Sequence, residues 1–306
     1  MMSRLIRARV GRRELPDPVP SSWQDALDAL IASDGEDEAQ FIAWYEANTG
    51  YQGNGFALGD LDFEANEITL TQNGQLLEGV DVPNIKIEAD DVEIRNCRVR
   101  DYSFSGLRYS PRVSNDVANG GAHIHHVHFD HPNIPSEATS TFGAQLWPRP
   151  LPHTLVEYCR VTGFTNGIDS RGATEIRYCW IDQLVQQGHT SGISGDGAHS
   201  HNHHNLVTSA TGSAAFNCYG SRDSDNRPLT DITLEYNVAL GATDIAIQFA
   251  HYPHENFDDF DDVERIVVRN NYAGPSVGPS PFQVGWPGTT PGSVVGPNFR
   301  TDGTQV

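Results

Sequence analysis

The sequence has little of several features that mark common classes of protein. Lys86 is its only lysine, the other 19 basic residues are arginines, and 40 acidic residues bring the net charge to −20. Such a charge repels phosphate, so the body of the chain is not expected to bind nucleic acid or an anionic membrane. No run of about eighteen apolar residues occurs, and no segment is therefore predicted to cross a membrane.

Several chemical signatures are also missing. The chain contains no P-loop, no G-x-S-x-G elbow and no G-x-G-x-x-G that opens a helix after a strand. Its 4 cysteines lack the C-x-x-C spacing of a structural zinc site. The first twenty residues contain neither an apolar core nor a small-residue cleavage site, so export by the Sec route is not expected.

What the sequence does contain is a repeated octet. TLVEYCRV from Thr154 and TEIRYCWI from Thr174 begin 20 residues apart. Related octets begin at Val92, Ala122, Ser200, Ile232 and Ile266. Strands this short cannot bury a core alone, so their repetition predicts a solenoid in which each coil covers the next. The longer intervals between octets indicate loops of variable length on a fixed coil.

Aligning the octets predicts which side chains stack. Position 3 is aliphatic except at Asn202, which favours an inward column, whereas position 4 holds Arg, His and Glu and favours outward ion pairs between coils. Position 6 holds Cys97, Cys159 and Cys179, or asparagine in three other octets. We predict stacked buried thiols and an asparagine ladder, with a Cys159–Cys179 disulfide as an alternative.

These octets, the opening TQNGQLLEGVDV and the segment HTSGIS resemble the right-handed parallel β-helix superfamily of pectate-lyase-like proteins, which includes bacteriophage tailspikes. The resemblance covers roughly residues 68–284. It implies an all-β solenoid, namely a right-handed parallel β-helix with a short α-helical N-terminal segment. It leaves activity open, because this fold carries lyases, hydrolases, epimerases and non-catalytic binders.

The N-terminal part is predicted to differ from the solenoid. Residues 1–13 carry five arginines and no acid, which predicts a basic arm held by a partner subunit or folded back on the acidic body. Two amphipathic helical runs follow before residue 50, and such helices cap a solenoid end or attach it to an assembly. We therefore expect an arm (1–20), a helical cap or attachment segment (21–50), a β-helix (51–284) and an irregular Gly- and Pro-rich tail (285–306).

The second strand of each coil is predicted to present a carbohydrate-binding face. Inward aliphatic residues there are each followed by a polar residue that should face out, with further polar and aromatic residues two positions later. The expected glycan-binding residues are Gln145, Trp147, Ser194, Asn217, Tyr219 and Gln248.

The same face offers catalytic candidates. Strand spacing places Asp169 and Asp196 about 8 Å apart. That is compatible with the roughly 6.5–9.5 Å of an inverting acid and base pair. Arg171 beside them would suit a lyase that stabilises a uronate, and His199 is a candidate base. An ordinary outward salt-bridge ladder remains the alternative interpretation.

Metal binding is considered at two places, and no cofactor is predicted, although calcium stays possible. His123 with His125, or His201 with His203, could chelate a transition metal, but the alternative is a row of solvent-facing histidines without a third ligand. The acidic loop HENFDDFDDVE lacks EF-hand spacing and is either solvated or a calcium site. Its candidate ligands are Asp258, Asp259, Asp261 and Asp262.

Two functions follow as hypotheses. In the first, the chain is a spike or decoration protein of a virion that attaches to a capsid or tail protein through residues 1–50 and engages host polysaccharide. In the second, it is a secreted polysaccharide-degrading enzyme, a lyase or an inverting hydrolase, that uses Asp169, Arg171 and Asp196.

Overall fold

The structure is a computed structural model. It describes residues 21–35, 38–100, 105–109, 120–131, 142–146, 153–170, 172–182, 184, 191–195, 198–208, 214–219, 229–241, 245–250, 264–285 and 292–306. Of residues 105–109, 142, 143, 145, 219, 250 and 285 only the backbone is described. The described chain is mostly β, with three α-helices and one short 3-10 helix.

The strands form three parallel sheets. Sheet A contains β1 (Asp62–Phe63), β4 (Val80–Val82), β7 (Arg98–Val99), β10 (His128–Asp130), β13 (Arg160–Thr162), β16 (Trp180–Asp182), β19 (Leu206–Val207), β22 (Val238–Ala239), β25 (Tyr272–Ala273) and β28 (Phe299–Arg300). Sheet B contains β2 (Ile68–Leu70), β5 (Ile85–Ile87), β8 (Ser105–Tyr109), β11 (Phe142–Leu146), β14 (Asn166–Ser170), β17 (Ser191–Gly195), β20 (Ala214–Tyr219), β23 (Ile247–Ala250) and β26 (Phe282–Gly285). Sheet C contains β3 (Leu76–Glu78), β6 (Glu93–Arg95), β9 (His123–His125), β12 (Thr154–Glu157), β15 (Thr174–Arg177), β18 (His201–His203), β21 (Thr230–Glu235), β24 (Glu264–Arg269) and β27 (Val294–Val295).

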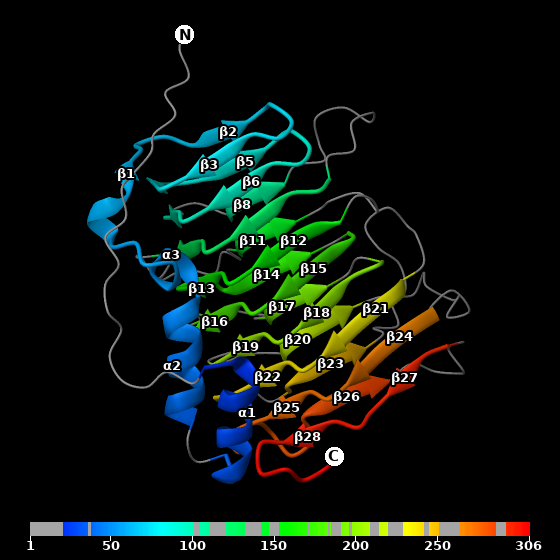
Figure 1. Cartoon of the computed structure of the whole chain (residues 1–306). Coiled ribbons are helices and arrows are strands. Elements are labelled where there is room, and N and C mark those ends of the chain that lie inside the picture. Colours follow the sequence, from blue (N-terminus) through cyan, green and yellow to red (C-terminus); the bar gives the residue numbers. More distant parts are fainter. Residues whose placement is uncertain are drawn as a thin grey trace.

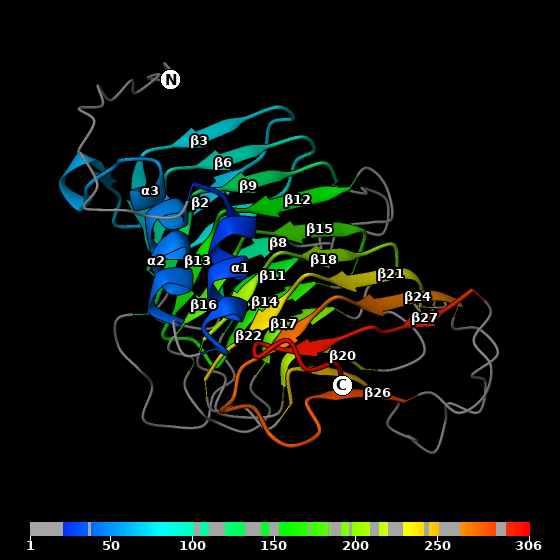
Figure 2. The ribbon, with the colours of Figure 1, turned by 60° about the horizontal axis from the view of Figure 1, so that its bottom comes forward.

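The order of the strands makes the molecule a stack of coils. Every third strand returns to the same sheet and pairs in parallel with the strand three positions earlier. Figures 1 and 2 show the coils stacked from β2 and β3 at one end to β26, β27 and β28 at the other. This arrangement is consistent with the predicted parallel β-helix. The strands also continue past residue 284, since β27 and β28 lie in the segment expected to be an irregular tail.

Each octet is the corner between sheets C and A. Positions 2 to 4 lie in sheet C, positions 7 and 8 lie in sheet A, and position 5 adopts a left-handed backbone that turns the chain between them. The left-handed residues are Asn96, His126, Tyr158, Tyr178, His204, Tyr236 and Asn270. Non-glycine residues pay about 1–2 kcal/mol for this conformation, so seven consecutive corners are held by contacts beyond the local backbone.

The inward columns form the core as predicted. Position 3 is in register from Ile94 through Asn202 to Val268, and the aliphatic members are buried. Cys97, Cys159 and Cys179 are buried at position 6 of their octets as free thiols, so the disulfide alternative is wrong. Burial raises the pKa of the Cys97 thiol to about 12, which keeps it protonated.

The asparagine ladder is confirmed and extends one coil further than expected. Asn205 donates to Asn237 Oδ1 at 3.0 Å, Asn237 donates to Asn271 Oδ1 at 3.1 Å, and Asn271 donates to Asn298 Oδ1 at 3.0 Å. Each acceptor oxygen also receives the backbone N–H of the preceding asparagine. The amides therefore satisfy buried backbone groups at the corner of each coil.

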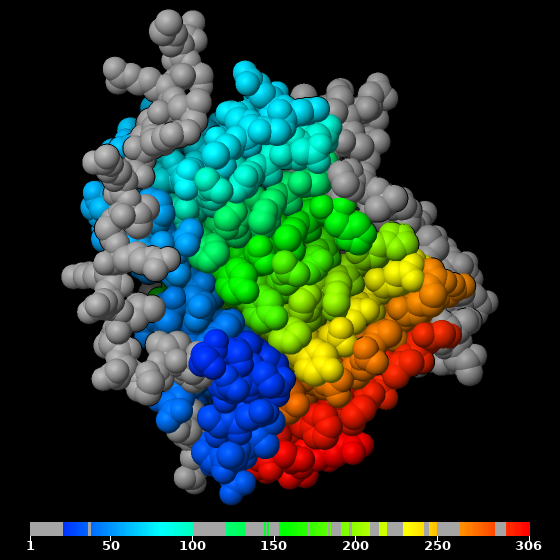
Figure 3. All heavy atoms as spheres, in the orientation of Figure 1, coloured from blue at the N-terminus to red at the C-terminus, as the bar shows by residue number. Residues whose placement is uncertain are grey.

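Three helices precede the stack: α1 (Trp23–Ala32), α2 (Glu38–Asn48) and α3 (Gly50–Gly53), followed by the 3-10 helix η1 (Leu58–Asp60). Ser22 caps α1 by accepting a hydrogen bond from the backbone N–H of Asp25. Figures 1 and 3 show α1 and α2 lying along the side of the stack. The expectation that they cap an open end is therefore not met.

The reason is the apolar surface of sheet A. Trp23, Leu27, Leu30 and Phe41 from the helices form one buried cluster with outward-facing residues of the sheet. These residues are Trp180, Leu206 and Val238 of sheet A, together with Leu240, which directly follows β22. In the part of the chain that the structure describes, no helix has the length and apolarity needed to span a bilayer.

Candidate functional site

The predicted polar face of sheet B exists as a continuous register. One residue after each inward apolar residue, a polar residue occupies the same register position on all nine strands; we call this set the sheet B polar row. Its members are Thr69, Lys86, Arg108, Gln145, Asp169, Ser194, Asn217, Gln248 and Gln283. Neighbouring members are thus one strand spacing apart, about 4.8 Å.

The row is not uniformly open to solvent, which corrects the expectation that it faces out along its whole length. Asp169 is 1% exposed and Asn217 is 3% exposed, whereas Ser194 and Gln248 are half-buried and Gln283 is exposed. Every residue of β14 is buried, so both sides of this strand are covered. Sequence alternation separates inner from outer positions, but it does not reveal what lies over the outer ones.

The buried asparagine of the row has a specific contact. Asn217 Nδ2 donates to Ser191 Oγ, while Asn217 Oδ1 has no hydrogen-bond partner among the described residues. Ser191 also donates its backbone N–H to Asn166 Oδ1 at 3.2 Å. Asn217 is therefore tied to the neighbouring strand β17 as well as belonging to the polar row.

The second predicted line on this face is mostly outside the described residues. Trp147, Arg171 and Asp196 are not described, and Tyr219 is described only as part of β20. Gln145 is placed by the register of β11, without its side chain. The predicted separation of Asp169 and Asp196 thus stays a prediction.

Loop length varies mainly around sheet B. The connection from sheet C to sheet A is short, as between His203 and Leu206. The two connections on either side of β20 are longer: one runs from Val207 to Ala214 and the other from Tyr219 to Thr230. Variable loops on a rigid scaffold are where binding functions concentrate. The polar row and its neighbouring loops are therefore the best candidate ligand-binding region.

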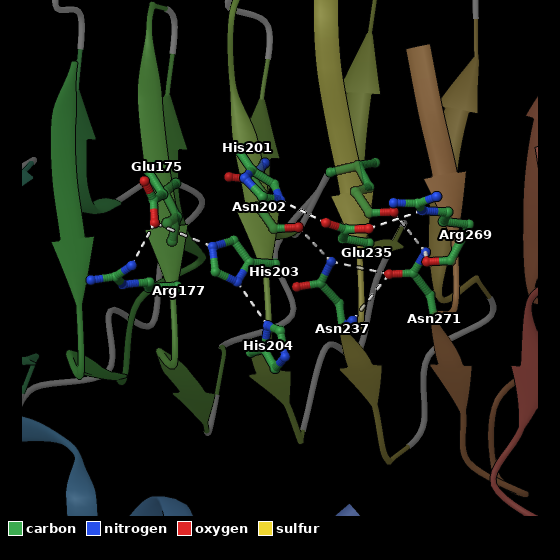
Figure 4. Close-up of polar contacts among 12 residues, drawn as sticks. Glu175, Arg177, His201, Asn202, His203, His204, Glu235, Asn237, Arg269 and Asn271 are labelled. Atoms are coloured by element: carbon green, nitrogen blue, oxygen red, sulfur yellow. Dashed lines mark hydrogen bonds and ion pairs between the residues drawn. The ribbon is translucent and has the colours of Figure 1, made fainter. Parts of the chain in front are cut away.

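The paired histidines form a second polar surface, on the outer face of sheet C. His123 Nε2 lies 2.9 Å from Glu157 Oε1, and His125 Nε2 lies 3.2 Å from Glu93 Oε1. Three coils on, His201 Nε2 lies 3.1 Å from Glu235 Oε1, and His203 Nε2 lies 3.3 Å from Glu175 Oε1 (Figure 4). The His123 and His125 rings stack with centroids 4.3 Å apart, and the His201 and His203 rings are tilted with centroids 4.2 Å apart.

Arginines join these pairs into a charge ladder. Arg177 bridges Glu157 and Glu175 at 2.8 Å each, and Arg269 Nε lies 3.0 Å from Glu235 Oε2 (Figure 4). Near the start of the stack, Arg95 bridges Glu78 and Glu93. Partly exposed pairs of this kind contribute at most about 1 kcal/mol each. The ladder fits the predicted outward ion pairs and leaves its carboxylates already occupied.

The geometry of this ladder does not assemble a metal site. Among the described residues, no group of three His, Cys, Asp or Glu side chains comes together around a possible ion. The Nε2 atoms of His123, His125, His201 and His203 each face a carboxylate within the ladder. The calcium candidates Asp258, Asp259, Asp261 and Asp262 lie outside the described residues.

His199 lies apart from the polar row. Its Nδ1 is 3.0 Å from Asp231 Oδ2, its side chain is 44% exposed, and its backbone N–H bonds to Thr230 on sheet C. Asp231 is in turn bound by Arg265, with Nη2 at 2.8 Å from Oδ2. These contacts place His199 in an exposed ion-pair cluster, and no described contact connects it to Asp169.

One set of residues was missed from the sequence. The left-handed corner residues stack as a column of rings, with centroids 5.2 Å apart for His126 and Tyr158, 5.1 Å for Tyr158 and Tyr178, 5.0 Å for Tyr178 and His204, and 5.1 Å for His204 and Tyr236. We call this the aromatic column. Position 5 of the aligned octets carried its signal, since all seven octets hold Tyr, His or Asn there and five consecutive octets hold a ring.

Two histidines of the aromatic column contact the charge ladder. His125 Nδ1 lies 3.0 Å from His126 Nδ1, and His203 Nδ1 lies 2.7 Å from His204 Nδ1. Burial lowers the pKa of His126 and of His204 to about 4, and the neighbouring His125 and His203 add to the effect. Both corner histidines are therefore neutral at pH 7.

Comparison of the sequence with protein-family models and with curated proteins finds no match. Function must therefore be argued from the arrangement of residues.

Proposed function

We propose that this chain is a right-handed parallel β-helix of the pectate-lyase-like type that binds polysaccharide along the outer face of sheet B. The rotation of the chain through three parallel sheets supports the fold, and crossovers between parallel strands are right-handed in about 98% of cases. The observation that carries the function is the unbroken sheet B polar row.

The chemistry of the row suits sugar hydroxyls. Amides both donate and accept hydrogen bonds, and Ser194 does the same through one hydroxyl. Repetition at about 4.8 Å lets one extended chain meet several coils in succession. Because Asp169 and Asn217 are buried, the accessible contacts are Ser194, Gln248 and Gln283, next to the longer loops.

We expect Gln248→Ala combined with Gln283→Ala to weaken polysaccharide binding about tenfold, because each lost hydrogen bond contributes roughly 0.5–1.5 kcal/mol. Isothermal titration against bacterial capsular and acidic polysaccharides measures the change. The matched control is Gln24→Ala, which removes an exposed amide from α1 and should leave binding unchanged. Equal binding by the double variant and the wild type would refute a role for this face.

Enzymatic cleavage is the second candidate, favoured by one buried carboxylate, Asp169, within the polar row. The same incubations, followed for reducing ends and for absorbance of unsaturated uronate, distinguish a lyase or hydrolase from a binder. Asp169→Asn and Asp196→Asn should abolish any product. Unchanged product formation in both variants would exclude these carboxylates from catalysis.

The proposal extends to a bacteriophage particle, where such a solenoid would serve as a spike or decoration protein. Because α1 and α2 use their apolar residues against sheet A, we assign attachment to a capsid or tail protein to residues 1–20 rather than to the helices. Mass spectrometry of purified particles would detect the chain as a component. Its absence from them would remove the virion from the proposal.

A further inference from the structure

The corner histidines have a geometry that glycan binding does not use. The motif His-x-His-His occurs at 123–126 and again at 201–204. In both places the histidine at the third position contacts a carboxylate and the histidine at the fourth position lies in the aromatic column. The identical arrangement three coils apart calls for an explanation in which adjacent histidines act together.

Hydrogen-bond chemistry fixes the protons of the second pair. Glu175 can only accept, so His203 carries its proton on Nε2 and leaves Nδ1 as an acceptor. His204 must then carry its proton on Nδ1 and donate it to His203 across 2.7 Å. Glu175, His203 and His204 thus form a directed chain from the exposed ladder to a ring beneath the helices. Glu93, His125 and His126 form the same chain.

Helices α1 and α2 both contact the corner of the coil at His204. The Trp23 ring lies edge-on to it with centroids 4.4 Å apart, and Tyr45 Oη donates to the His204 carbonyl oxygen at 2.7 Å. Trp23 Nε1 in turn donates to Tyr45 Oη at 2.7 Å. Tyr178 and Tyr236 hold the imidazole from the two neighbouring coils. The ring cannot turn without disturbing Trp23.

We propose that the His203 and His204 pair is an acid-sensitive latch, in which binding of one additional proton unseats Trp23 and loosens α1 and α2 from sheet A. The added proton enters at His204 Nε2, because the two Nδ1 atoms share one hydrogen bond and His203 Nε2 already carries a proton. The His204 ring then becomes a cation packed against Trp23 and between Tyr178 and Tyr236. Hydration of this cation requires Trp23 to move away from the ring.

The surrounding charges do not supply a counterion to His204. On its own strand it meets His203 and, further away, His201; from the neighbouring coils it meets Glu235, Arg177 and the hydroxyl-bearing rings of Tyr178 and Tyr236. From the helices, the Trp23 ring meets the imidazole and the Tyr45 hydroxyl bonds to the His204 carbonyl oxygen. Glu235 favours the added proton, but it is already shared between His201 and Arg269.

The direction of the pH effect follows from these contacts. With α1 and α2 docked on sheet A, burial lowers the pKa of His204 to about 4, against about 6.5 for an exposed histidine. The open state, in which the helices are detached, therefore binds the proton more tightly. Opening is therefore favoured as pH falls below about 6.5. Full recovery of the ordinary pKa would favour opening about 30-fold at pH 5, and we expect about tenfold because the ring is partly solvated.

Hydrogen exchange of the α1 amides in the full chain tests the latch. After correction for the intrinsic rate, exchange of residues 23–32 should rise about tenfold from pH 7 to pH 5, while strands β12 and β15 stay protected. His204→Tyr removes the titrating ring and should abolish the rise. Tyrosine suits the position, because Tyr158, Tyr178 and Tyr236 adopt the same left-handed conformation in other coils. His199→Asn, which removes an exposed histidine outside the pair, should retain it.

Two results would overturn the proposal. One is wild-type exchange in α1 that does not change with pH, and the other is an undiminished rise in His204→Tyr. Should His204→Tyr fold poorly, nitrogen NMR of the wild type still decides, because the latch requires His204 protonated on Nδ1 and His203 on Nε2 at pH 7. The opposite tautomers would exclude it. None of these outcomes depends on glycan binding.

Discussion

At the scale of single residues, two buried asparagines one coil apart have opposite roles. Asn237 donates to Asn202 O at 2.8 Å and to Asn271 Oδ1 at 3.1 Å, and its own Oδ1 accepts from Asn205. Asn202 instead stands in the aliphatic column between Ile176 and Leu234, and its Oδ1 has no hydrogen-bond partner among the described residues. The hydrogen-bonding groups of the side chain are thus satisfied at Asn237, whereas the side-chain oxygen of Asn202 is unsatisfied among the described residues.

Leucine at these two positions should therefore have unequal effects. Asn237→Leu leaves several buried donors and acceptors unpaired, at about 1–3 kcal/mol each, and we expect it to lower the free energy of unfolding by about 3–5 kcal/mol. Asn202→Leu restores the aliphatic column and should change that free energy by less than about 1 kcal/mol or increase it. Urea unfolding of both variants measures this, and equal losses would contradict the assigned roles.

At the scale of elements, sheet B depends on small residues where its strands approach closely. A Cβ on Gly192 would lie 2.5 Å from Ala215 O and 2.7 Å from Val207 Cγ2, and one on Gly167 would lie 2.2 Å from Gly192 O. At these glycines, sheet B lies close to the inner side of sheet A. This close approach explains why glycine is the second residue of the strands that carry Asp169 and Ser194.

Gly192→Ala should consequently destabilise the fold. Overpacking of this kind costs about 1–3 kcal/mol, and the clash involves backbone that cannot move aside easily. Gly59→Ala is the matched control, because a Cβ there meets nothing within 4 Å. Thermal and urea unfolding should show a lower midpoint for the first variant only, and a similar shift in both would indicate that close strand approach is unimportant.

The helices show how an element can be predicted while its position is not. The apolar stripe with Trp23, Leu27 and Leu30 was recognisable from its spacing, and these residues are buried as that stripe requires. Its partner is an apolar strip made of residues from three successive coils. No local pattern in the sequence joins those residues, so the sequence alone does not place the helices against sheet A.

At the scale of the whole molecule, buried neutral histidines make stability depend on pH. Burial lowers the pKa of His126 and His204 to about 4 and that of His128 to about 3, so the unfolded chain binds these protons more tightly than the folded one. The stability that they provide is complete above about pH 6.5 and is lost as pH falls toward 4 and then 3.

We expect the free energy of unfolding to fall by about 1–3 kcal/mol between pH 7 and pH 5, after allowance for solvent screening. Below about pH 4.5 a second loss should begin, because ladder contacts keep the pKa of Glu93, Glu157 and Glu235 below its ordinary value. Urea titrations at pH 7, 6 and 5 measure the first phase. His126→Tyr with His204→Tyr should remove most of this phase and leave the part due to His128. Constant stability of the wild type across this range would show that the histidines are not buried in solution.

The sequence by itself determined which residues stack on one another from coil to coil. A residue and its equivalent in the next octet must meet across one strand spacing, so the columns from Ile94 to Val268 and from Asn205 to Asn271 could be written down before any coordinates. Only the tertiary structure decided what lies against the outside of the stack. The contact of Trp23 with His204 joins segments distant in sequence, and no repeat carries that information. The burial of Asp169 was likewise visible only in the structure.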